Sequence, residues 1–394
     1  MHGILALSAL HLASLHPDRK REYTTQSARH QEVALSRLRT GLFDTTEENC
    51  FEHFLLAYLV ILFNFYSIGN PLPDDDDDDD SGRPPAPLDM HELGQTLFLG
   101  QGIMNMISTP ETWSWMKRGP LSALFNTQHK NPTPSNLAGH HHNATSSSSS
   151  SSSSFPHRLT LLTDLVSSIG GSPAESKARA SCLLACDALR RAYGAAVLIP
   201  HNKSNNSSST TDDDDPTNTP TPTNTPTPTT TTTTTTQQKS RPRRPRAEAT
   251  PVWVWLTLLP ADFRAHVAGG HPVALVVLAH YAALVRCFED RWYLAGWSGR
   301  VLEAVERALV GVAGAAGAGD MGGGGGEEGG GEEEEEDEKR RRCGWREWLE
   351  FPKRFGAAEL DEAIREGWER EKQKEREREG EREGGGWVQT NASS

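Results

Sequence analysis

Residues 271–299 read HPVALVVLAHYAALVRCFEDRWYLAGWSG, a long apolar and aromatic stretch. Its apolar side chains fall on almost every face of a helix, which leaves no polar face for solvent. Such a helix is buried inside a larger helical structure or lines an apolar cavity. Residues 345–352, WREWLEFP, repeat this aromatic character. Because no catalytic group stands out in the stretch, it predicts a helical ligand-binding or interaction domain rather than an enzyme.

The segments around this stretch also carry helical patterns. Residues 22–43, for example, are amphipathic, with Ala28, Leu35, Leu38 and Leu42 on one stripe. Helices are predicted at residues 2–15, 22–43, 49–68, 88–107, 110–125, 156–169, 174–199, 251–267, 271–288, 291–310 and 359–383. The predicted fold class is therefore all-α, a single multi-helix domain interrupted by long disordered low-complexity inserts.

The inserts are recognised by composition alone. Serine, threonine-proline, glycine and acidic runs cannot bury enough apolar surface to offset chain entropy. We assign one domain to residues 1–368 and a charged disordered or helical tail to residues 369–394. The expected inserts are residues 71–87, 127–154, 202–250 and 311–343. Much of the formal net charge of −13 lies in such runs, so it says little about a partner.

The cysteines and the apolar runs indicate in which kind of cellular compartment the protein is expected. The five cysteines are odd in number and scattered, which does not fit a disulfide framework. Cys182 and Cys186 lie four apart without further ligands at suitable spacing, so buried thiols are expected rather than a metal site. The apolar run from Phe54 to Phe63 is about ten residues, too short for a bilayer span. We therefore predict a reducing compartment and no transmembrane segment.

Several literal motif matches carry little weight. Residues 317–322 fit G-x-G-x-x-G but open no helix, and His140–His142 lie in a serine-rich insert. Asp74–Asp80 is similar to the aspartate-rich magnesium motifs of helical isoprenoid enzymes, yet flanking prolines prevent a rigid helix. That enzyme class stays open as an alternative. Lone His11 and His280 on apolar helices are expected to be core histidines with satisfied hydrogen bonds.

Two basic clusters are better candidates for a function. Exposed, flexible cations can enter an acidic receptor groove, as nuclear import signals do, although a charged linker has the same composition. The first cluster provides the candidate import residues Lys239, Arg241, Arg243, Arg244 and Arg246, and the second, shorter cluster is residues 339–342. The expected location is the nucleus, with a share in the cytoplasm left open.

The order of segments carries a family resemblance. The matching stretches are HGILALSALHLA at 2–13, RHQ at 29–31, TEENC at 46–50, residues 272–297 and the closing residues 345–352. In this order they resemble the regulatory domain of fungal-specific transcription factors, and most of all the subgroup that contains the sterol uptake regulators.

The resemblance implies an all-α regulatory domain that acts in RNA polymerase II transcription. In the sterol regulators the domain holds ergosterol in a pocket, and loss of the ligand promotes nuclear activity. Apolar helices at 54–65 and 273–297 could line such a pocket, although the same side chains could simply fill a core. The candidate ligand-binding residues are Leu59, Phe63, Leu278, Tyr281, Trp292 and Trp297.

The chain departs from the family in one respect. Members usually carry an N-terminal binuclear zinc cluster with six closely spaced cysteines, and no such cluster is present here. We therefore expect no direct DNA contact from this chain and no cofactor in it, zinc being implied only if an upstream cluster exists. Expected partners are the transcriptional machinery or related transcription factors, with a homodimer or heterodimer left open. The alternative is a DNA-binding-deficient partner of full-length relatives.

Overall fold

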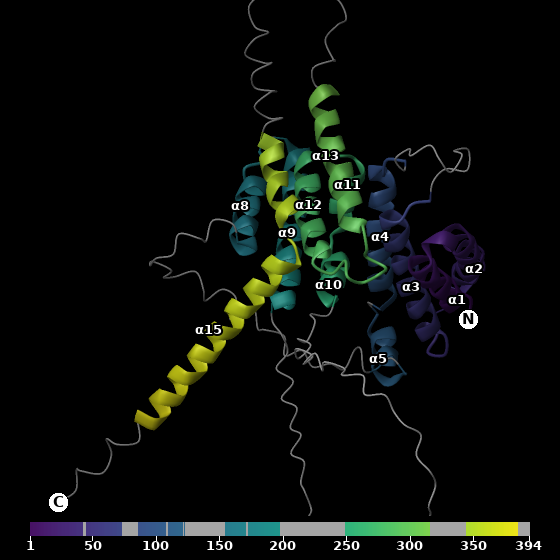
Figure 1. The fold of residues 1–394 in the computed structure, drawn as a ribbon, viewed down its shortest axis with the longest axis horizontal. Coiled ribbons are helices and arrows are strands. Elements are labelled where there is room, and N and C mark those ends of the chain that lie inside the picture. Colours follow the sequence, from purple (N-terminus) through teal and green to yellow (C-terminus); the bar gives the residue numbers. More distant parts are fainter. Residues whose placement is uncertain are drawn as a thin grey trace, which may run out of the picture. The chain divides into compact units, whose positions relative to one another are not determined.

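The computed structural model describes residues 1–41, 45–72, 86–107, 109–120, 122, 154–170, 172–197, 249–315 and 344–384. Every regular element within these ranges is a helix, and none of the described residues forms a strand (Figure 1). The all-α prediction is confirmed. Most residues of the four expected inserts, together with Asp74–Asp80, His140–His142 and both basic clusters, lie outside the described ranges.

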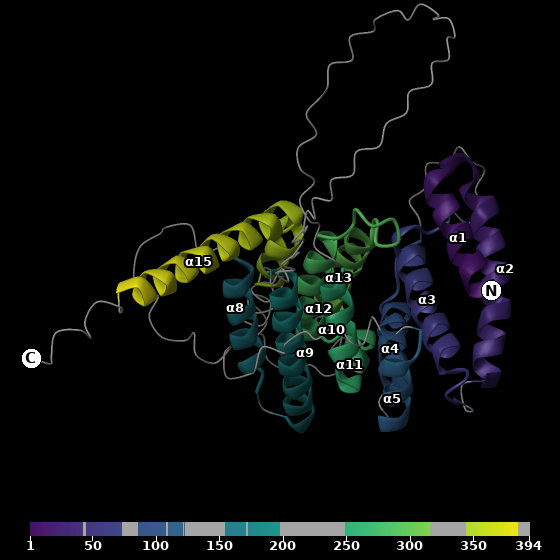
Figure 2. The same cartoon turned by 90° about the horizontal axis from the view of Figure 1, so that it is seen from below.

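The N-terminal helices pack as neighbours along the chain. α1 contacts both α2 and α3, and α3 contacts α4 and α5 (Figure 2). Between α1 and α2, the Ser27 hydroxyl donates to the Ala6 carbonyl at 2.9 Å, which allows a close approach of the two backbones. The bounds are α1 His2–Leu15, the short 3₁₀ helix η1 Pro17–Arg19, α2 Lys20–Gly41, α3 Cys50–Gly69, α4 Met90–Ile107 and α5 Pro110–Arg118.

The remaining helices surround α12. It contacts α8, α9, α10, α11 and α13. Residues 344–354 are also helical, and the start of α15 packs against α9. The bounds are α8 Phe155–Ser167, α9 Pro173–Val197, α10 Thr250–Leu258, α11 Ala261–Ala268, α12 Pro272–Arg286, α13 Trp297–Ala315 and α15 Ala357–Gly384.

The stretch that predicted a buried helix is the centre of this arrangement. Every residue from Val273 to Val285 is buried, so α12 has no solvent face. α12 has no polar face because other helices pack around it and leave no side for solvent. The expectation of a buried helix is confirmed.

Several helix boundaries differ from the prediction, with clear causes. The helix expected at 251–267 is two helices, because Leu259 precedes Pro260 and adopts an extended backbone that ends α10. The helix expected at 291–310 begins only at Trp297, after a run of turns that includes Gly296 at φ 77°. α5 ends at Arg118, short of the expected residue 125.

The amphipathic stripe of α2 is also shifted. Ala28 is exposed, whereas Ser27 and Ala34 are buried. Ser27 lies at the α1–α2 contact, where its hydrogen bond replaces the apolar packing that the stripe predicted. Leu35 is half-buried against a hydrophobic cluster between α1 and α3, as the stripe predicted, whereas Leu42 and the side chain of Leu38 lie outside the described residues.

One described helix, α3, is long and apolar enough to cross a membrane by length and composition. It extends well past the Phe54–Phe63 run on which the prediction rested. Of its most apolar window, 44% is buried within the structure. The core helices of soluble proteins can be equally long and apolar, and α3 packs here against several other helices, so α3 is no clear transmembrane segment.

Candidate functional site

An aromatic network connects α3, α10, α12, α13 and the turns between α12 and α13. At its centre, the Trp253 ring lies 5.4 Å from Tyr58, 5.6 Å from Phe65 and 6.3 Å from Tyr293. Phe65 is buried, but Tyr58, Trp253 and Tyr293 each keep part of their surface exposed. The residues of this network are Tyr58, Phe65, Tyr66, Trp253, Trp255, Tyr281, Trp292, Tyr293 and Trp297.

One arm of the network runs into the core. Phe65 stacks on Trp297 at 4.8 Å, and Trp297 meets Tyr281 edge to face at 5.7 Å. Tyr281 then stacks on Trp255 at 3.8 Å and donates its hydroxyl to the Val252 carbonyl at 3.0 Å. All of these side chains are buried, so this arm acts as core packing with the offset and edge geometries that aromatic rings favour.

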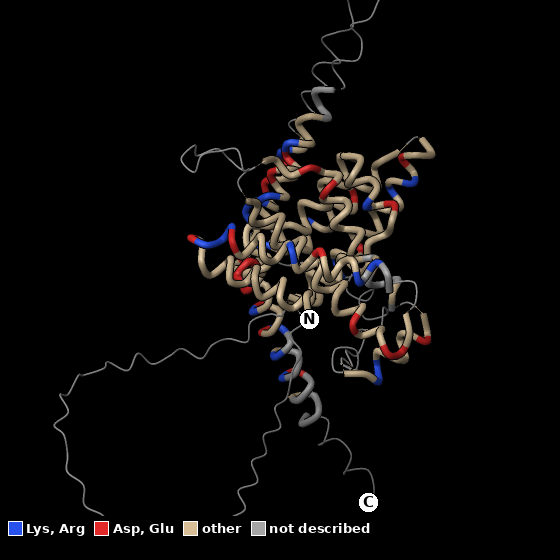
Figure 3. The backbone as a smooth tube through the Cα atoms, turned by 90° about the vertical axis from the view of Figure 1, so that its right-hand side faces the viewer, with Lys and Arg blue, Asp and Glu red and all other residues tan. Residues whose placement is uncertain are grey.

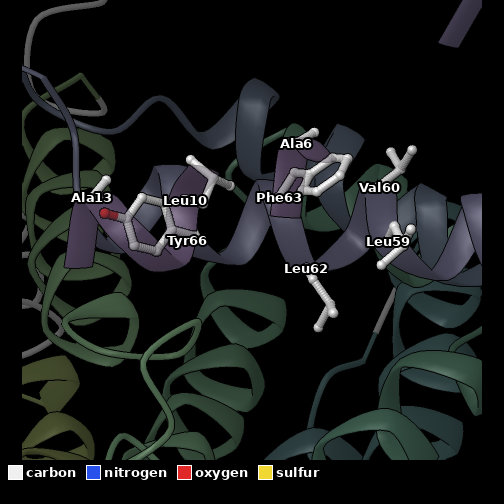
Figure 4. Packing of buried hydrophobic residues seen from close by; sticks show 8 residues of the cluster. All are labelled: Ala6, Leu10, Ala13, Leu59, Val60, Leu62, Phe63 and Tyr66. Atoms are coloured by element: carbon white, nitrogen blue, oxygen red, sulfur yellow. The ribbon is translucent and has the colours of Figure 1, made fainter. Parts of the chain in front are cut away.

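The other arm runs to the surface near α1. Tyr293 meets Trp292 edge to face at 5.7 Å, and Trp292 contacts Tyr66 at 5.6 Å and stacks on His11 at 5.0 Å. Trp292 is half-buried and also packs on a hydrophobic cluster between α1 and α3. We call it the α1–α3 cluster (Figure 4), and it consists of Ala6, Leu10, Ala13, Leu59, Val60, Leu62, Phe63 and Tyr66.

Five of the six predicted ligand-binding residues fall into two groups. Leu59 and Phe63 belong to the α1–α3 cluster, with Trp292 packed against it. Tyr281 and Trp297 are in contact within the buried arm. Ring contacts through Phe65, Trp253 and Tyr293 join the two groups. Leu278 belongs to neither group and is buried in α12. Only Trp292 of the six is half-buried, and their role in binding stays a prediction.

The residues that join the groups were missed from the sequence. Tyr58, Phe65 and Tyr66 are spaced i, i+7 and i+8 in α3, a signal that places them on one helix face. Trp253 and Trp255 lie two residues apart in α10 and point to different surroundings, one half-buried and one buried. Helical periodicity could have found the first set, whereas nothing in the spacing pairs Trp253 with α3.

Two buried polar atoms in the network have no hydrogen-bond partner within the described part of the chain. They are the Tyr66 hydroxyl and the Trp297 indole N–H. Leaving a buried donor unpaired costs roughly 1–3 kcal/mol. The Tyr66 hydroxyl points toward Ala13 of α1 (Figure 4), and burial raises the pKa of Tyr66. Trp297 is fully buried in the core arm, whereas Tyr66 contacts half-buried Trp292 on the arm that reaches the surface.

A second aromatic cluster surrounds His280. Its ring lies 5.9 Å from Phe351 and 6.4 Å from Trp348, so the 345–352 segment packs on α12. Phe155 extends this cluster at 5.8 Å from Phe351. His280 is fully buried, its Nδ1 lies 2.9 Å from the Val276 carbonyl, and burial lowers its pKa to about 4. His280 is a core histidine as predicted, but its Nε2 has no hydrogen-bond partner among the described residues, so it is not the satisfied histidine that was expected. The expectation for His11 was wrong, because His11 is exposed.

The two cysteines of α9, Cys182 and Cys186, are buried thiols. Burial raises the pKa of Cys182 and Cys186 to about 12, which keeps both thiols protonated at neutral pH. Within the described ranges, no group of three or more His, Cys, Asp or Glu side chains could hold a metal ion. Acidic and basic residues are interspersed along the described helices (Figure 3).

Comparison with known proteins gives no match: no family model fits the chain, and no curated protein or solved structure is similar to it. The family resemblance therefore stays a prediction. The function is argued below from the aromatic network and the surroundings of its polar atoms.

Proposed function

We propose that this chain is a non-catalytic, all-α regulatory domain of the fungal zinc-cluster transcription factor type, which responds to an apolar ligand. The observation that carries the proposal is the surface arm of the aromatic network. There, half-buried Trp292 contacts Tyr66, whose buried hydroxyl has no partner among the described residues. The half-buried rings of Tyr293 and Trp253 continue the row from Trp292.

This arrangement suits a rigid, mostly apolar ligand with one oxygen. Such ligands bind against apolar and aromatic surfaces, and a small number of polar groups fixes their orientation. Trp253, Trp292 and Tyr293 would lose their remaining exposure against the ligand, while the Tyr66 hydroxyl would bond the ligand's oxygen. A sterol has both features, and it is the ligand class that the family resemblance implies.

The electrostatics support binding rather than catalysis. Catalytic groups usually have pKa values tuned toward the working pH. Here burial moves the pKa of His280 to about 4 and that of Cys182 to about 12, so each group stays neutral near pH 7. We infer that the buried titratable groups serve packing.

The regulatory role would be exercised in the nucleus, on the transcriptional machinery or on related transcription factors. The import cluster from Lys239 to Arg246 lies outside the described residues and remains a sequence-based proposal. A fluorescent fusion in which Arg243 and Arg244 are replaced by alanine should shift from the nucleus to the cytoplasm.

A binding titration tests the ligand proposal. The purified chain is titrated with ergosterol delivered from cyclodextrin, and tryptophan fluorescence is recorded. We expect a saturable change, because Trp253 and Trp292 border the site. Tyr66→Phe should weaken binding by about 3–10-fold through the loss of one hydrogen bond.

Tyr23→Phe is the matched control. Tyr23 also packs against the α1–α3 cluster but is not part of the aromatic network, so its hydroxyl should not matter for affinity. The proposal fails if ergosterol gives no saturable change, or if Tyr66→Phe and Tyr23→Phe weaken binding equally.

A further inference from the structure

Helix α1 is apolar on two opposite faces. Gly3, Ala6, Ala9, Leu10 and Ala13 are buried, and this face packs against α2 and α3. The opposite face leaves large side chains in solvent. The exposed apolar residues are Ile4 at 52%, Leu5 at 41%, Leu12 at 39% and Leu15 at 59%.

These exposed residues form a stripe rather than a scatter. Ile4, Leu5, Ser8, Leu12 and Leu15 follow the spacing that places side chains on one side of a helix. A contiguous apolar stripe on a soluble protein usually marks an interaction surface. We call these five residues the α1 stripe.

The two serine hydroxyls of α1 would not oppose burial of this stripe. The Ser8 hydroxyl already donates to the Ile4 carbonyl at 2.9 Å, and Ser14 donates to the His11 carbonyl at 2.7 Å. Both hydroxyl protons are therefore satisfied within the helix and need no water. α1 also contains no Asp, Glu, Lys or Arg, so its burial desolvates no such charge.

The sequence of the α1 stripe favours a second copy of the chain as the partner that covers it. Ser8 lies midway between Ile4 and Leu12, and also midway between Leu5 and His11. When two stripes cross antiparallel at Ser8, Ile4 of each copy faces Leu12 of the other, and the small serine permits a close approach. A two-fold interface needs this self-complementarity. Antiparallel helix dipoles also attract, and no like charges meet.

A membrane surface fits the α1 stripe less well. Helices that lie on membranes combine an apolar face with lysines and arginines, which bind anionic headgroups. α1 has neither residue. A second copy requires no such charges.

We propose that the chain forms an antiparallel homodimer through the α1 stripe, with Ser8 at the two-fold axis. α1 is about 21 Å long, since its 14 residues rise 1.5 Å each. Stable interfaces bury about 800 Å² per partner, more than one short helix face supplies, so the dissociation constant should be on the order of 10 µM. The ligand-free protein should dimerise, so this inference does not depend on the ligand proposal.

Sedimentation velocity over about 1–100 µM tests the dimer in the full chain. We expect reversible dimerisation that weakens at least 10-fold in Leu15→Glu and in Ile4→Glu. Leu184→Glu on α9 is the matched control, because Leu184 is 58% exposed against 59% for Leu15. It should leave dimerisation unchanged, and circular dichroism should show all variants folded.

A cysteine pair tests the orientation. In a Cys343→Ser background, Ser8→Cys should form an intermolecular disulfide under mild oxidation, whereas Ile4→Cys should not pair with itself. Monomeric wild-type protein would overturn the proposal, including monomer that binds anionic vesicles. So would a dimer that is insensitive to Ile4→Glu and Leu15→Glu, or one in which only Ile4→Cys crosslinks.

Discussion

Two tyrosines of the aromatic network differ in what surrounds a single oxygen atom. Tyr281 donates its hydroxyl to the Val252 carbonyl at 3.0 Å, whereas the buried hydroxyl of Tyr66 has no partner among the described residues. A satisfied buried hydrogen bond contributes about 1 kcal/mol, and an unsatisfied donor costs free energy. Replacing tyrosine by phenylalanine should therefore have different effects at the two positions.

We predict that Tyr281→Phe lowers the free energy of unfolding by about 1 kcal/mol, because it removes a buried hydrogen bond. Tyr66→Phe should leave this free energy unchanged or raise it by up to about 1 kcal/mol, because it removes an unpaired donor. Urea unfolding of the ligand-free chain, followed by circular dichroism, measures both. If the two changes lowered the free energy of unfolding equally, the Tyr281 hydroxyl could not be the only one of the two with a hydrogen bond, and the prediction would be wrong.

His280 should make stability depend on pH. Burial lowers its pKa from 6.5 to about 4, with the cation of Arg158 acting in the same direction. Between these values the unfolded chain binds more protons than the folded one, so stability falls as pH drops from about 6.5 toward 4. The loss approaches about 1.4 kcal/mol per pH unit within that window.

His271 also contributes in this window, because burial lowers its pKa as well. The variant His280→Gln isolates the contribution of His280, because glutamine stays neutral. The difference in unfolding free energy between wild type and variant should shrink as pH falls below about 6.5. A difference that is constant from pH 7 to about 4.5 would rule out this role of His280.

At the scale of elements, the crossing between α3 and the start of α13 depends on a glycine. A Cβ atom at Gly69 would meet the Ala295 carbonyl and lie 2.9 Å from the Trp297 backbone nitrogen. Asn70 reinforces this contact by donating its side-chain amide to the Ala295 carbonyl at 3.1 Å. The crossing holds Phe65 against Trp297, and so it positions the aromatic network.

We predict that Gly69→Ala destabilises the fold by about 1–3 kcal/mol, because the backbone atoms that it meets cannot move independently. Gly194→Ala in α9 is the matched control, since a Cβ atom there meets nothing within 4 Å. That change should stabilise the fold by up to about 1 kcal/mol through helix propensity. Thermal unfolding of both variants checks this, and a stable Gly69→Ala protein would refute the close crossing.

The helices themselves were largely predictable from local patterns. The apolar run of α12 indicated burial on all sides, and the structure confirms it. The errors occurred where a local signal competes with the pattern, as at Pro260, or where a tertiary hydrogen bond replaces apolar packing, as at Ser27. Neither Ala28's exposure nor the late start of α13 at Trp297 is visible in hydrophobic periodicity.

The candidate site was less predictable. Tyr281 and Trp297 were selected from one apolar block and do meet. Their connection to Trp292 requires Phe65 and Trp253, whose contact joins helices far apart in sequence. Spacing along one helix cannot report such a contact, because it depends on how two helices cross.

At the scale of the whole molecule, the described helices form a domain in which the site depends on distant segments. α3, α10, α12, α13 and the turns after α12 each supply rings to the aromatic network. A ligand that binds there would contact helices that are far apart in the sequence, and it should stabilise the folded domain by mass action. Ligand binding and domain stability are therefore linked.

The most direct test of the account is thermal unfolding of the full chain with and without ergosterol. We predict a melting temperature that rises with ergosterol concentration, rises less in Tyr66→Phe, and barely changes with cholestane, which lacks the oxygen that Tyr66 would bond. A melting temperature that is unaffected by ergosterol, or equally raised by both compounds in wild type and Tyr66→Phe, would contradict the proposed site.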